Sequence, residues 1–416
     1  MDKIRDVLLL QKRELEHFSQ KHYVPRDIEL SGLHNDIIKV IIGPRRAGKS
    51  FFAIHELKKS GNFGYVNFDD EGLLKVENYN DIIENINHLY NNPKSLLLDE
   101  IQNLAGWELF VNRLQRQGYN LIITGSNSNL LSRELATHLT GRHISTVVFP
   151  FSFKEYLRYF DRDSTSSEIK IRLNDYLHKG GFPEPLVKDI PHKEYLKTLH
   201  DAIVFKDILK RHNLRSPRPM GDLSTYLISN SGSLVSYRKL ASMIGLKSAH
   251  TINKYLGFFE EVFLFFQLRA FFAKYKKQVR SNKKVYTIDN GLINAAAFNL
   301  IENMGPLYEN AVAVELKRRE LNGELECFYY NTKQGYEVDF VIKKGLEITQ
   351  LIQVCYNVEK QNTKNREVRA LLHASVELKC NRLTVITADH ENIEDSEWQG
   401  IKGKIEFVPL WKWLLH

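Results

Sequence analysis

Short apolar runs separated by helical patterns are the clearest feature of the first third of the chain. Residues 37–42, with Ile37, Ile38, Val40, Ile41 and Ile42, are almost wholly apolar, which is typical of a strand buried on both faces of a parallel sheet. Similar runs follow at residues 63–68, 95–98, 120–124 and 143–149. Because strands that alternate with helices form parallel sheets through right-handed crossovers, the pattern predicts an α/β domain over about 37–150.

The pattern changes on both sides of this domain. Residues 1–36 predict a helix followed by an extended link, and residues 151–220 predict helices. Residues 221–300 predict helices of the winged-helix type, and residues 301–416 return to a mixed α/β pattern. A chain of 416 residues exceeds one ordinary core, so several domains are expected.

Composition narrows the class of protein. Hydrophobic residues make up 43% of the chain and charged residues 26%, which suits a soluble globular protein. No run of apolar residues is long enough to span a membrane, and the N-terminus lacks the pattern of a secretory signal. Three widely spaced cysteines suit a reducing compartment. We therefore expect a cytoplasmic protein without a membrane segment.

The net charge of +8 permits binding to nucleic acid, because lysine and arginine neutralise phosphates. A basic balance does not require it, since many basic proteins only carry a solvated lysine surface.

A glycine-rich turn follows the first predicted strand and fits G-x-x-x-x-G-K-[ST] at every fixed position. Glycines let the backbone curl so that its amides point at phosphate oxygens, and the next helix begins there with a favourable dipole. Lys49 should reach the β- and γ-phosphates of ATP, and Ser50 should hold Mg²⁺. The residues expected to contact the nucleotide are Gly43, Pro44, Arg45, Arg46, Ala47, Gly48, Lys49, Ser50 and Phe51.

Two acids end the third predicted strand, at Asp99 and Glu100. Asp99 is placed to order the Mg²⁺ shell, and Glu100 to polarise the attacking water. An acid pair of this kind can also be a plain helix cap. Together with the phosphate-binding loop, it favours ATP hydrolysis with Glu100 and Lys49 as catalytic residues.

The fourth predicted strand ends in polar residues that could orient water between the acids and the γ-phosphate. Thr124, Ser126 and Asn127 are candidates, and Ser126 is preferred over a plain polar turn. Two arginines follow, Arg133 and Arg142. An arginine inserted into a neighbouring subunit's site would neutralise charge in the transition state, and Arg142 is preferred for this role. This hypothesis implies a homo-oligomer.

These motifs together resemble the AAA-type ATPases, and more narrowly a prokaryotic family that joins an AAA domain to a C-terminal domain of unknown function. The segments that carry the resemblance are GPRRAGKS at 43–50, NFDDE at 67–71, LLLDEIQN at 96–103, ITGSNSNLLS at 123–132, Gly141-Arg142, PFSF at 150–153 with Glu155, GGFP at 180–183, YTIDNGL at 286–292 and GYEVDF at 335–340. The resemblance covers most of residues 30–360. It implies an AAA-like P-loop domain, a winged helix and a C-terminal domain with a nuclease-like fold.

The middle region has helix-turn-helix texture over residues 236–266, with Gly245-Leu246-Lys247 as the turn. Lys247, His250, Asn253 and Lys254 could face a groove of DNA. A basic hairpin is expected next, because residues 274–284 contain six cations and no acid. Such a hairpin could contact phosphates, or it could be a solvated loop on a domain that binds another protein.

The C-terminal region predicts a helix over 307–320, strands over 325–330, 336–342 and 347–354, a helix over 363–377 and a strand over 383–387. This order resembles the PD-(D/E)xK nucleases, a restriction-endonuclease-like fold in which a helix Glu, a strand Asp and an acid-x-Lys pair bind Mg²⁺. Glu309 and Asp339 match the first two positions and form a second candidate metal site. Gln353 and Cys355 stand where the acid and lysine are expected, with Lys343 or Lys344 as substitutes, so a degenerate nuclease is predicted.

Three functions remain open at this point. The first is an ATPase that acts as a switch or motor on nucleic acid, with ATP and Mg²⁺ as cofactors. The second is an ATP-gated scaffold for a protein partner, with an inactive nuclease-like domain. The third is an ATP-dependent nuclease.

Overall fold

The computed structural model describes residues 2–18, 20–33, 35–73, 76–127, 141–160, 163–214, 216–246, 248–297 and 304–416. The chain divides into two compact units, Met1–Pro150 with Glu261–Phe263, and Phe151–Glu260 with Leu264–His416. Arg133 and Lys247, which the sequence offered as candidate site residues, lie outside the described residues. No helix in the described ranges is long and apolar enough to cross a membrane.

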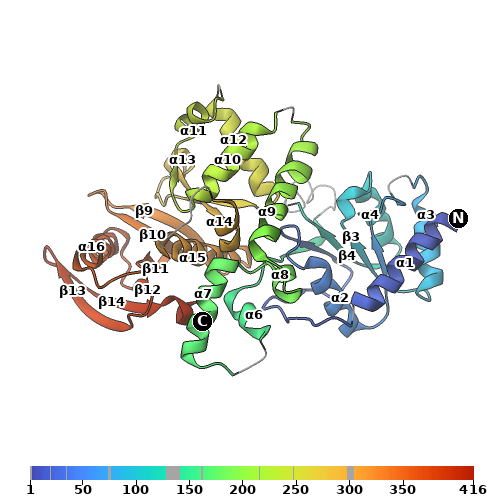
Figure 1. The fold of residues 1–416 in the computed structure, drawn as a ribbon, viewed down its shortest axis with the longest axis horizontal. Helices are drawn as coiled ribbons and strands as arrows, with labels where there is room; N and C mark the ends of the chain where they lie inside the picture. Colours follow the sequence, from blue (N-terminus) through green and yellow to red (C-terminus); the bar gives the residue numbers. More distant parts are fainter. Residues whose placement is uncertain are drawn as a thin grey trace. The chain divides into compact units, whose positions relative to one another are not determined.

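The first unit is built on a five-stranded sheet with the order β2-β3-β4-β1-β5, and every neighbouring pair is parallel (Figure 1). The sequence-based prediction of a parallel α/β domain is confirmed. Its elements are α1 (Asp2–Phe18), β1 (Ile38–Ile42), α2 (Lys49–Ser60), β2 (Phe63–Asn67), α3 (Tyr79–Leu89), β3 (Ser95–Asp99), η1 (Ile101–Asn103), α4 (Trp107–Arg116), β4 (Asn120–Gly125) and β5 (His143–Val147).

Burial explains why these strands are so apolar. All five residues of β1 are buried, because β4 and β5 flank the strand and helices cover it. Lys39 is the charged residue among the apolar residues of β1. Its ammonium donates to the carbonyl of Asn35, which precedes β1, and to the side chain of Asn120, the first residue of β4. In a parallel sheet all carboxyl ends lie along one edge. The residues that follow β1, β3 and β4 therefore meet there.

The second unit begins with helices and then forms a small three-stranded sheet with the order β6-β8-β7. The helices are α6 (Phe153–Arg158), α7 (Ser166–Lys179), α8 (Pro183–Val187), α9 (His192–Ala202), the π-helix η3 (Ile203–Lys210) and α10 (Arg218–Ser229). The segment around the small sheet contains β6 (Leu234–Val235), α11 (Tyr237–Met243), α12 (Ala249–Glu261), β7 (Phe265–Arg269), α13 (Tyr275–Arg280), β8 (Lys283–Thr287) and α14 (Asn290–Ala296).

Two sequence-based predictions are wrong in this segment. The second helix of the helix-turn-helix was expected to reach residue 266, but α12 ends at Glu261 and β7 begins at Phe265. The apolar run after Glu261 leads into β7 instead, and the backbone groups of β7 pair with β8. The basic segment was expected to form a hairpin, but it contains the short helix α13 and only its last two lysines enter β8.

The C-terminal part of the second unit holds a six-stranded mixed sheet with the order β13-β14-β12-β11-β10-β9. Helices α15 and α16 both pack against β11, and Figure 1 shows α16 lying beside the strands β10 to β14. The predicted helix, three strands, helix and strand are confirmed. The strands β13 and β14 extend the sheet beyond them, and the short helix α17 follows β14. The bounds are α15 (Met304–Leu321), β9 (Glu326–Asn331), β10 (Glu337–Lys344), β11 (Glu347–Val354), α16 (Gln361–Leu378), β12 (Leu383–Thr387), β13 (Asn392–Trp398), β14 (Ile401–Pro409) and α17 (Leu410–Trp413).

Candidate active site

The loop after β1 turns sharply because two of its glycines are required by space and by backbone conformation. A Cβ on Gly43 would lie 2.0 Å from the carbonyl oxygen of Val148, so no larger residue fits. Gly48 has a φ of 91° and stands immediately before α2, where it directs the chain into the helix. The first amides of α2 therefore point into the loop, where they can bind phosphate oxygens.

Lys49 is the first residue of α2, and its side chain is only 4% exposed. Its ammonium donates to the carbonyl of Gly43 at 3.2 Å and to that of Pro44 at 3.0 Å. It also lies 3.9 Å from the Glu100 carboxylate. The lysine is thus held inside the curl of the loop, at the place where an anionic phosphate would compete for it.

Three hydroxyls converge on the buried carboxylate of Asp99. Ser50 donates to Oδ1 at 2.8 Å, Thr124 also donates to Oδ1, and the Tyr65 hydroxyl donates to Oδ2 at 3.2 Å. Burial and the neighbouring Glu100 carboxylate raise the pKa of Asp99, although these hydrogen bonds and Lys49 oppose the rise. The Asp99 carboxylate and the Ser50 hydroxyl place two oxygen atoms side by side, and oxygen atoms are the ligands that Mg²⁺ takes.

Glu100 follows β3 in the left-handed region, with a φ of 51°. Its backbone amide donates to Thr124 Oγ1 at 3.0 Å, and its carboxylate accepts from Gln102 at 2.5 Å. Burial alone would raise the pKa of Glu100. Lys49, the Gln102 amide, Arg45 and the nearby Ser126 hydroxyl outweigh it, and the net pKa is lowered. Glu100 is therefore held as a carboxylate, the form that can accept a proton from water.

The structure brings most of the predicted nucleotide-site residues together, but not Arg142. The Arg142 carbonyl accepts from the amide of Ile38, so this arginine stands at the start of β5, beside the start of β1. The phosphate-binding loop follows the other end of β1, across the length of the strand. The exposed Arg142 side chain is therefore remote from the phosphate-binding loop of the same chain.

Sequence reasoning missed three residues that support this site. Tyr65 and Gln102 contact the two acids, and Arg26 donates to the carbonyls of Ala47 and Phe149 beside the loop. Gln102 stands two residues after Glu100 in the quoted LLLDEIQN segment, so only its role was overlooked. Tyr65 and Arg26 belong to no motif of the site, and only the fold brings them to it.

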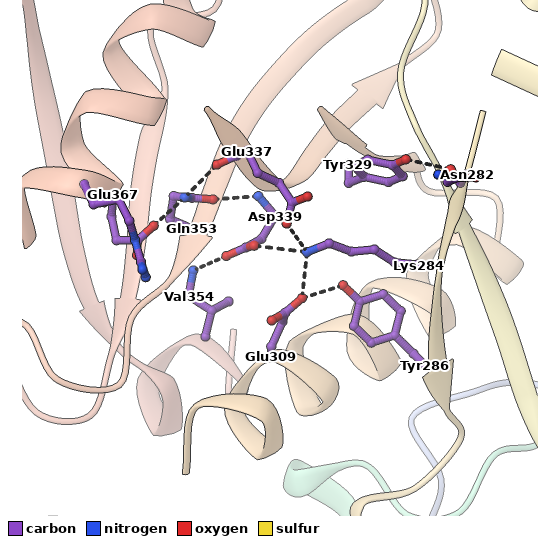
Figure 2. Close-up of polar contacts among 11 residues, drawn as sticks. Asn282, Lys284, Tyr286, Glu309, Tyr329, Glu337, Asp339, Gln353, Val354 and Glu367 are labelled. Carbon is purple, nitrogen blue, oxygen red and sulfur yellow. Dashed lines mark hydrogen bonds and ion pairs between the residues drawn. The ribbon is translucent and has the colours of Figure 1, made fainter. Parts of the chain in front are cut away.

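A second polar cluster lies in the second unit around Lys284 of β8. Figure 2 shows the lysine side chain reaching between Glu309 of α15 and Glu337 and Asp339 of β10. The ammonium lies 3.0 Å from Glu309, 2.8 Å from Glu337 and 3.3 Å from Asp339. Tyr286, two residues further along the same strand face, donates its hydroxyl to Glu309 at 2.7 Å.

The electrostatics of this cluster keep Lys284 charged. The lysine is only 3% exposed, and burial alone would lower its pKa. Tyr286 and the carboxylates of Asp339, Glu309 and Glu337 more than offset this effect, so the net pKa is raised. Burial and the Asp339 carboxylate raise the pKa of Glu309 to about 7. The cluster therefore has three carboxylates around one permanent ammonium, and one of the three gains a proton near neutral pH.

The residues considered for the acid and the lysine of the nuclease motif make other contacts in the structure. The Gln353 side chain accepts from the Asp339 amide at 2.6 Å and donates to Glu367 at 2.6 Å (Figure 2). Cys355 is buried in the hydrophobic core of the C-terminal sheet. Lys343 pairs with Glu326 instead of the cluster. The cation that does stand among these acids is Lys284, which the sequence placed in the basic hairpin. The prediction that Lys284 contacts phosphate is wrong, because its side chain is buried. Among the described residues, no group of three or more His, Cys, Asp and Glu side chains is arranged to hold a metal ion.

Comparison with known families divides the chain into three parts. Residues 35–157 match a family described as an AAA domain. Residues 170–302 and 304–413 match two families described as domains of unknown function, DUF8612 and DUF4143.

Two relatives match almost end to end. The uncharacterized protein MJ1544 of Methanocaldococcus jannaschii is 37% identical over 96% of this chain and 93% of its own length. An uncharacterized protein of Haemophilus influenzae is 32% identical over 96% of this chain and 98% of its own length. Among solved structures, the Walker-type ATPase PABY2304 of Pyrococcus abyssi aligns with 62% of this chain and 90% of its own, at 16% identity and a TM-score of 0.43. A structural likeness of that degree says nothing about activity.

Proposed function

The chain belongs to the family of the M. jannaschii protein MJ1544, and from this premise we propose that it is a Mg²⁺-dependent ATPase acting as a switch or motor on nucleic acid. The AAA-domain match supports the nucleotide-dependent part of the proposal. One observation carries it furthest: Ser50 contacts Asp99, while Lys49 lies beside Glu100, along one edge of a parallel sheet. This arrangement provides a phosphate site, oxygen ligands and a base in one place.

Each of these side chains has a role that follows from its surroundings. Lys49 would exchange its bonds to the loop carbonyls for phosphate oxygens of ATP. Ser50 and Asp99 would hold Mg²⁺, which neutralises phosphate charge when bound. Glu100, kept ionised by Lys49 and Gln102, would orient the attacking water and accept its proton. Thr124 would fix both acids, since it bonds the Asp99 carboxylate and the Glu100 amide.

Steady-state ATP hydrolysis tests the proposal. Lys49→Ala should abolish nucleotide binding. Glu100→Gln should keep it and lower kcat by about 100-fold or more, the usual scale for loss of a general base. Lys59→Ala and Glu56→Gln are matched controls, because that ion pair lies further along α2. Normal turnover by Glu100→Gln would remove Glu100 from the catalytic role.

The nucleic-acid part of the proposal rests on the segment around β7, α13 and β8. Its order, α10-β6-α11-α12-β7-α13-β8 with a small antiparallel sheet, supports a winged-helix domain in which α13 lies between the two strands of the wing. Homo-oligomerisation belongs to the same proposal. Arg142 is exposed, and in an oligomer it could act at a neighbouring subunit's nucleotide. Sedimentation of Glu100→Gln with and without ATP tests the assembly, and a monomer under both conditions would contradict it.

The C-terminal domain supports a second candidate function, an ATP-gated scaffold with an inactive nuclease-like fold. The specific observation is the Lys284 ammonium, which stands among Glu309, Glu337 and Asp339, where a nuclease would need its metal. An ammonium 2.8–3.3 Å from three carboxylates competes directly with a divalent cation for them. We propose that the cluster is structural and that the domain does not cleave DNA.

Two measurements separate these functions. Plasmid DNA incubated with the protein, Mg²⁺ and ATP should stay intact, and cleavage that disappears in Asp339→Ala would instead establish the nuclease. ATP hydrolysis that responds to nucleic acid would favour the switch or motor, whereas unresponsive hydrolysis would favour the protein scaffold.

A further inference from the structure

The basic segment of the middle region separates into an inward and an outward part. Residues 262–288 contain seven cations and no acid. Lys284 is buried in the acidic cluster, but α13 has no buried residue at all. Within the described ranges, no carboxylate pairs with the four cations that α13 and the residue before it carry, Lys274, Lys276, Lys277 and Arg280. Their positive charge is therefore available to an outside partner.

Large apolar side chains stand among these cations. Tyr275 is 71% exposed, Val279 50% and Phe272 38%. Exposure of aromatic and aliphatic groups to water is unfavourable, and a bound partner removes that exposure. Such patches therefore commonly mark binding surfaces. A surface that joins aromatic faces to unpaired cations fits a ligand with flat rings and negative charge.

A cavity of about 610 Å³ opens beside this surface. Phe271, Phe272, Tyr275 and Gln278 line it from the α13 connection, and Arg269 and Lys283 line it from β7 and β8. Arg269 and Lys283 are register partners on adjacent strands, so two cations stand side by side at the wall, and Glu260, Glu320 and Glu326 line the same cavity. Burial and Arg269 lower the pKa of Lys283, although Glu260 opposes them. The volume lies within the range of ligand-binding pockets.

We propose that this surface binds single-stranded nucleic acid, with phosphates on Lys274, Lys276, Lys277 and Arg280 and an unpaired base against Tyr275 at the mouth of the cavity. The inference rests on the proposed function and specifies its partner. A duplex keeps its bases stacked inside, so it could use the lysines but neither an exposed tyrosine nor a cavity lined with phenylalanine. An unpaired strand can use all three, because every base has a face that stacks on an aromatic ring.

Fluorescence anisotropy on the full chain tests the inference, using a labelled 20-nucleotide strand and the duplex of the same sequence. The single strand should bind more tightly, and Tyr275→Leu should weaken it by about fivefold to a hundredfold, the range for loss of one stacked base. Tyr275→Phe should bind normally, because it keeps the ring. Lys276→Ala/Lys277→Ala should weaken both ligands and reduce the dependence of affinity on salt. Lys402→Ala/Lys404→Ala removes two exposed lysines from β14 and should change nothing.

The outcomes are distinct. Equal or tighter duplex binding with no effect of Tyr275→Leu would overturn the single-strand inference and leave the proposed action on nucleic acid intact. If neither the single strand nor the duplex binds, both the single-strand inference and the proposed action on nucleic acid are wrong. Binding to vesicles containing phosphatidylserine, with none to nucleic acid, would make this an anionic membrane surface and overturn the inference as well.

Discussion

At the scale of single residues, the nucleotide site combines what a motif specifies with what only the fold supplies. The loop from Gly43 to Ser50 and the Asp99-Glu100 pair were predictable, because phosphate and magnesium chemistry requires those residue types at that spacing. Tyr65 was not, because it belongs to no motif. It meets Asp99 through the pairing of β2 with β3. Thr124, a candidate from the sequence, bonds both acids, while the preferred Ser126 lies near Glu100.

Thr124 therefore yields a prediction for a single hydroxyl. Thr124→Val keeps the shape but leaves the Glu100 amide without an acceptor and Asp99 with one donor fewer. An unmet buried polar group costs about 1–3 kcal/mol, so hydrolysis should fall by roughly tenfold or more. Binding of ATP without Mg²⁺ should hardly change, since the phosphate-binding loop is intact.

Thr124→Ser is the matched control for this measurement, because it retains the hydroxyl. Turnover is measured at saturating ATP over a series of Mg²⁺ concentrations. If Thr124→Val and Thr124→Ser hydrolyse ATP equally fast, Thr124 does not position the acids.

At the scale of elements, β8 shows why charge along a sequence does not report where charge lies. Lys283 and Lys284 are adjacent, yet side chains alternate across a strand. Lys283 lines the cavity, and Lys284 points into the acidic cluster. The sequence indicated one continuous basic segment, because the strand bounds and the position of Glu309, 25 residues away, could not be inferred from spacing. Strand and helix bounds in the C-terminal region were more predictable, since apolar alternation and length set them.

The cluster around β8 also predicts how stability depends on pH. Burial and Asp339 raise the pKa of Glu309 from 4.5 to about 7, so between these values the native state binds more protons than the unfolded state. The free energy of unfolding should therefore fall as pH rises from about 4.5 to about 7. Glu309→Gln removes this titration. Between pH 5 and pH 8, the free energy of unfolding of this variant should fall less than that of the wild type, by at most about 3 kcal/mol.

Urea denaturation of wild type and Glu309→Gln at several pH values measures this difference. Glu326→Gln is the control, because Glu326 lies on β9 and pairs with Lys343 outside the cluster. A wild type and a Glu309→Gln variant with the same pH profile would show that Glu309 titrates normally in the folded protein.

At the scale of the whole molecule, the sequence predicted the kinds of layers better than their connections. The parallel sheet followed from five apolar runs, but its order, β2-β3-β4-β1-β5, depends on contacts between distant strands that one sequence does not encode locally. The GGFP and YTIDNGL segments show the same limit. Asp289 caps α14 and accepts from the Gly181 amide at 2.7 Å, across 108 residues. Both segments were noted as motifs, and only the fold explains why they occur together.

The proposed nucleotide site and the proposed single-strand surface belong to different units of one chain, so a motor or switch must couple them. Binding at one can influence the other only if a strand has different affinities for the ATP-bound and ATP-free states. Single-stranded nucleic acid should then raise ATP hydrolysis several-fold at low salt. Lys276→Ala/Lys277→Ala should keep the basal rate and lose most of the stimulation, whereas Lys402→Ala/Lys404→Ala should keep both.

Reciprocity gives an independent check: the affinity of Glu100→Gln for single-stranded nucleic acid should change on adding ATP, by the same factor by which the nucleic acid changes the affinity for ATP. Stimulation that persists in Lys276→Ala/Lys277→Ala would place the coupled surface elsewhere on the chain. If the affinity for single-stranded nucleic acid is the same with and without ATP, the two sites are independent and the protein is not a motor.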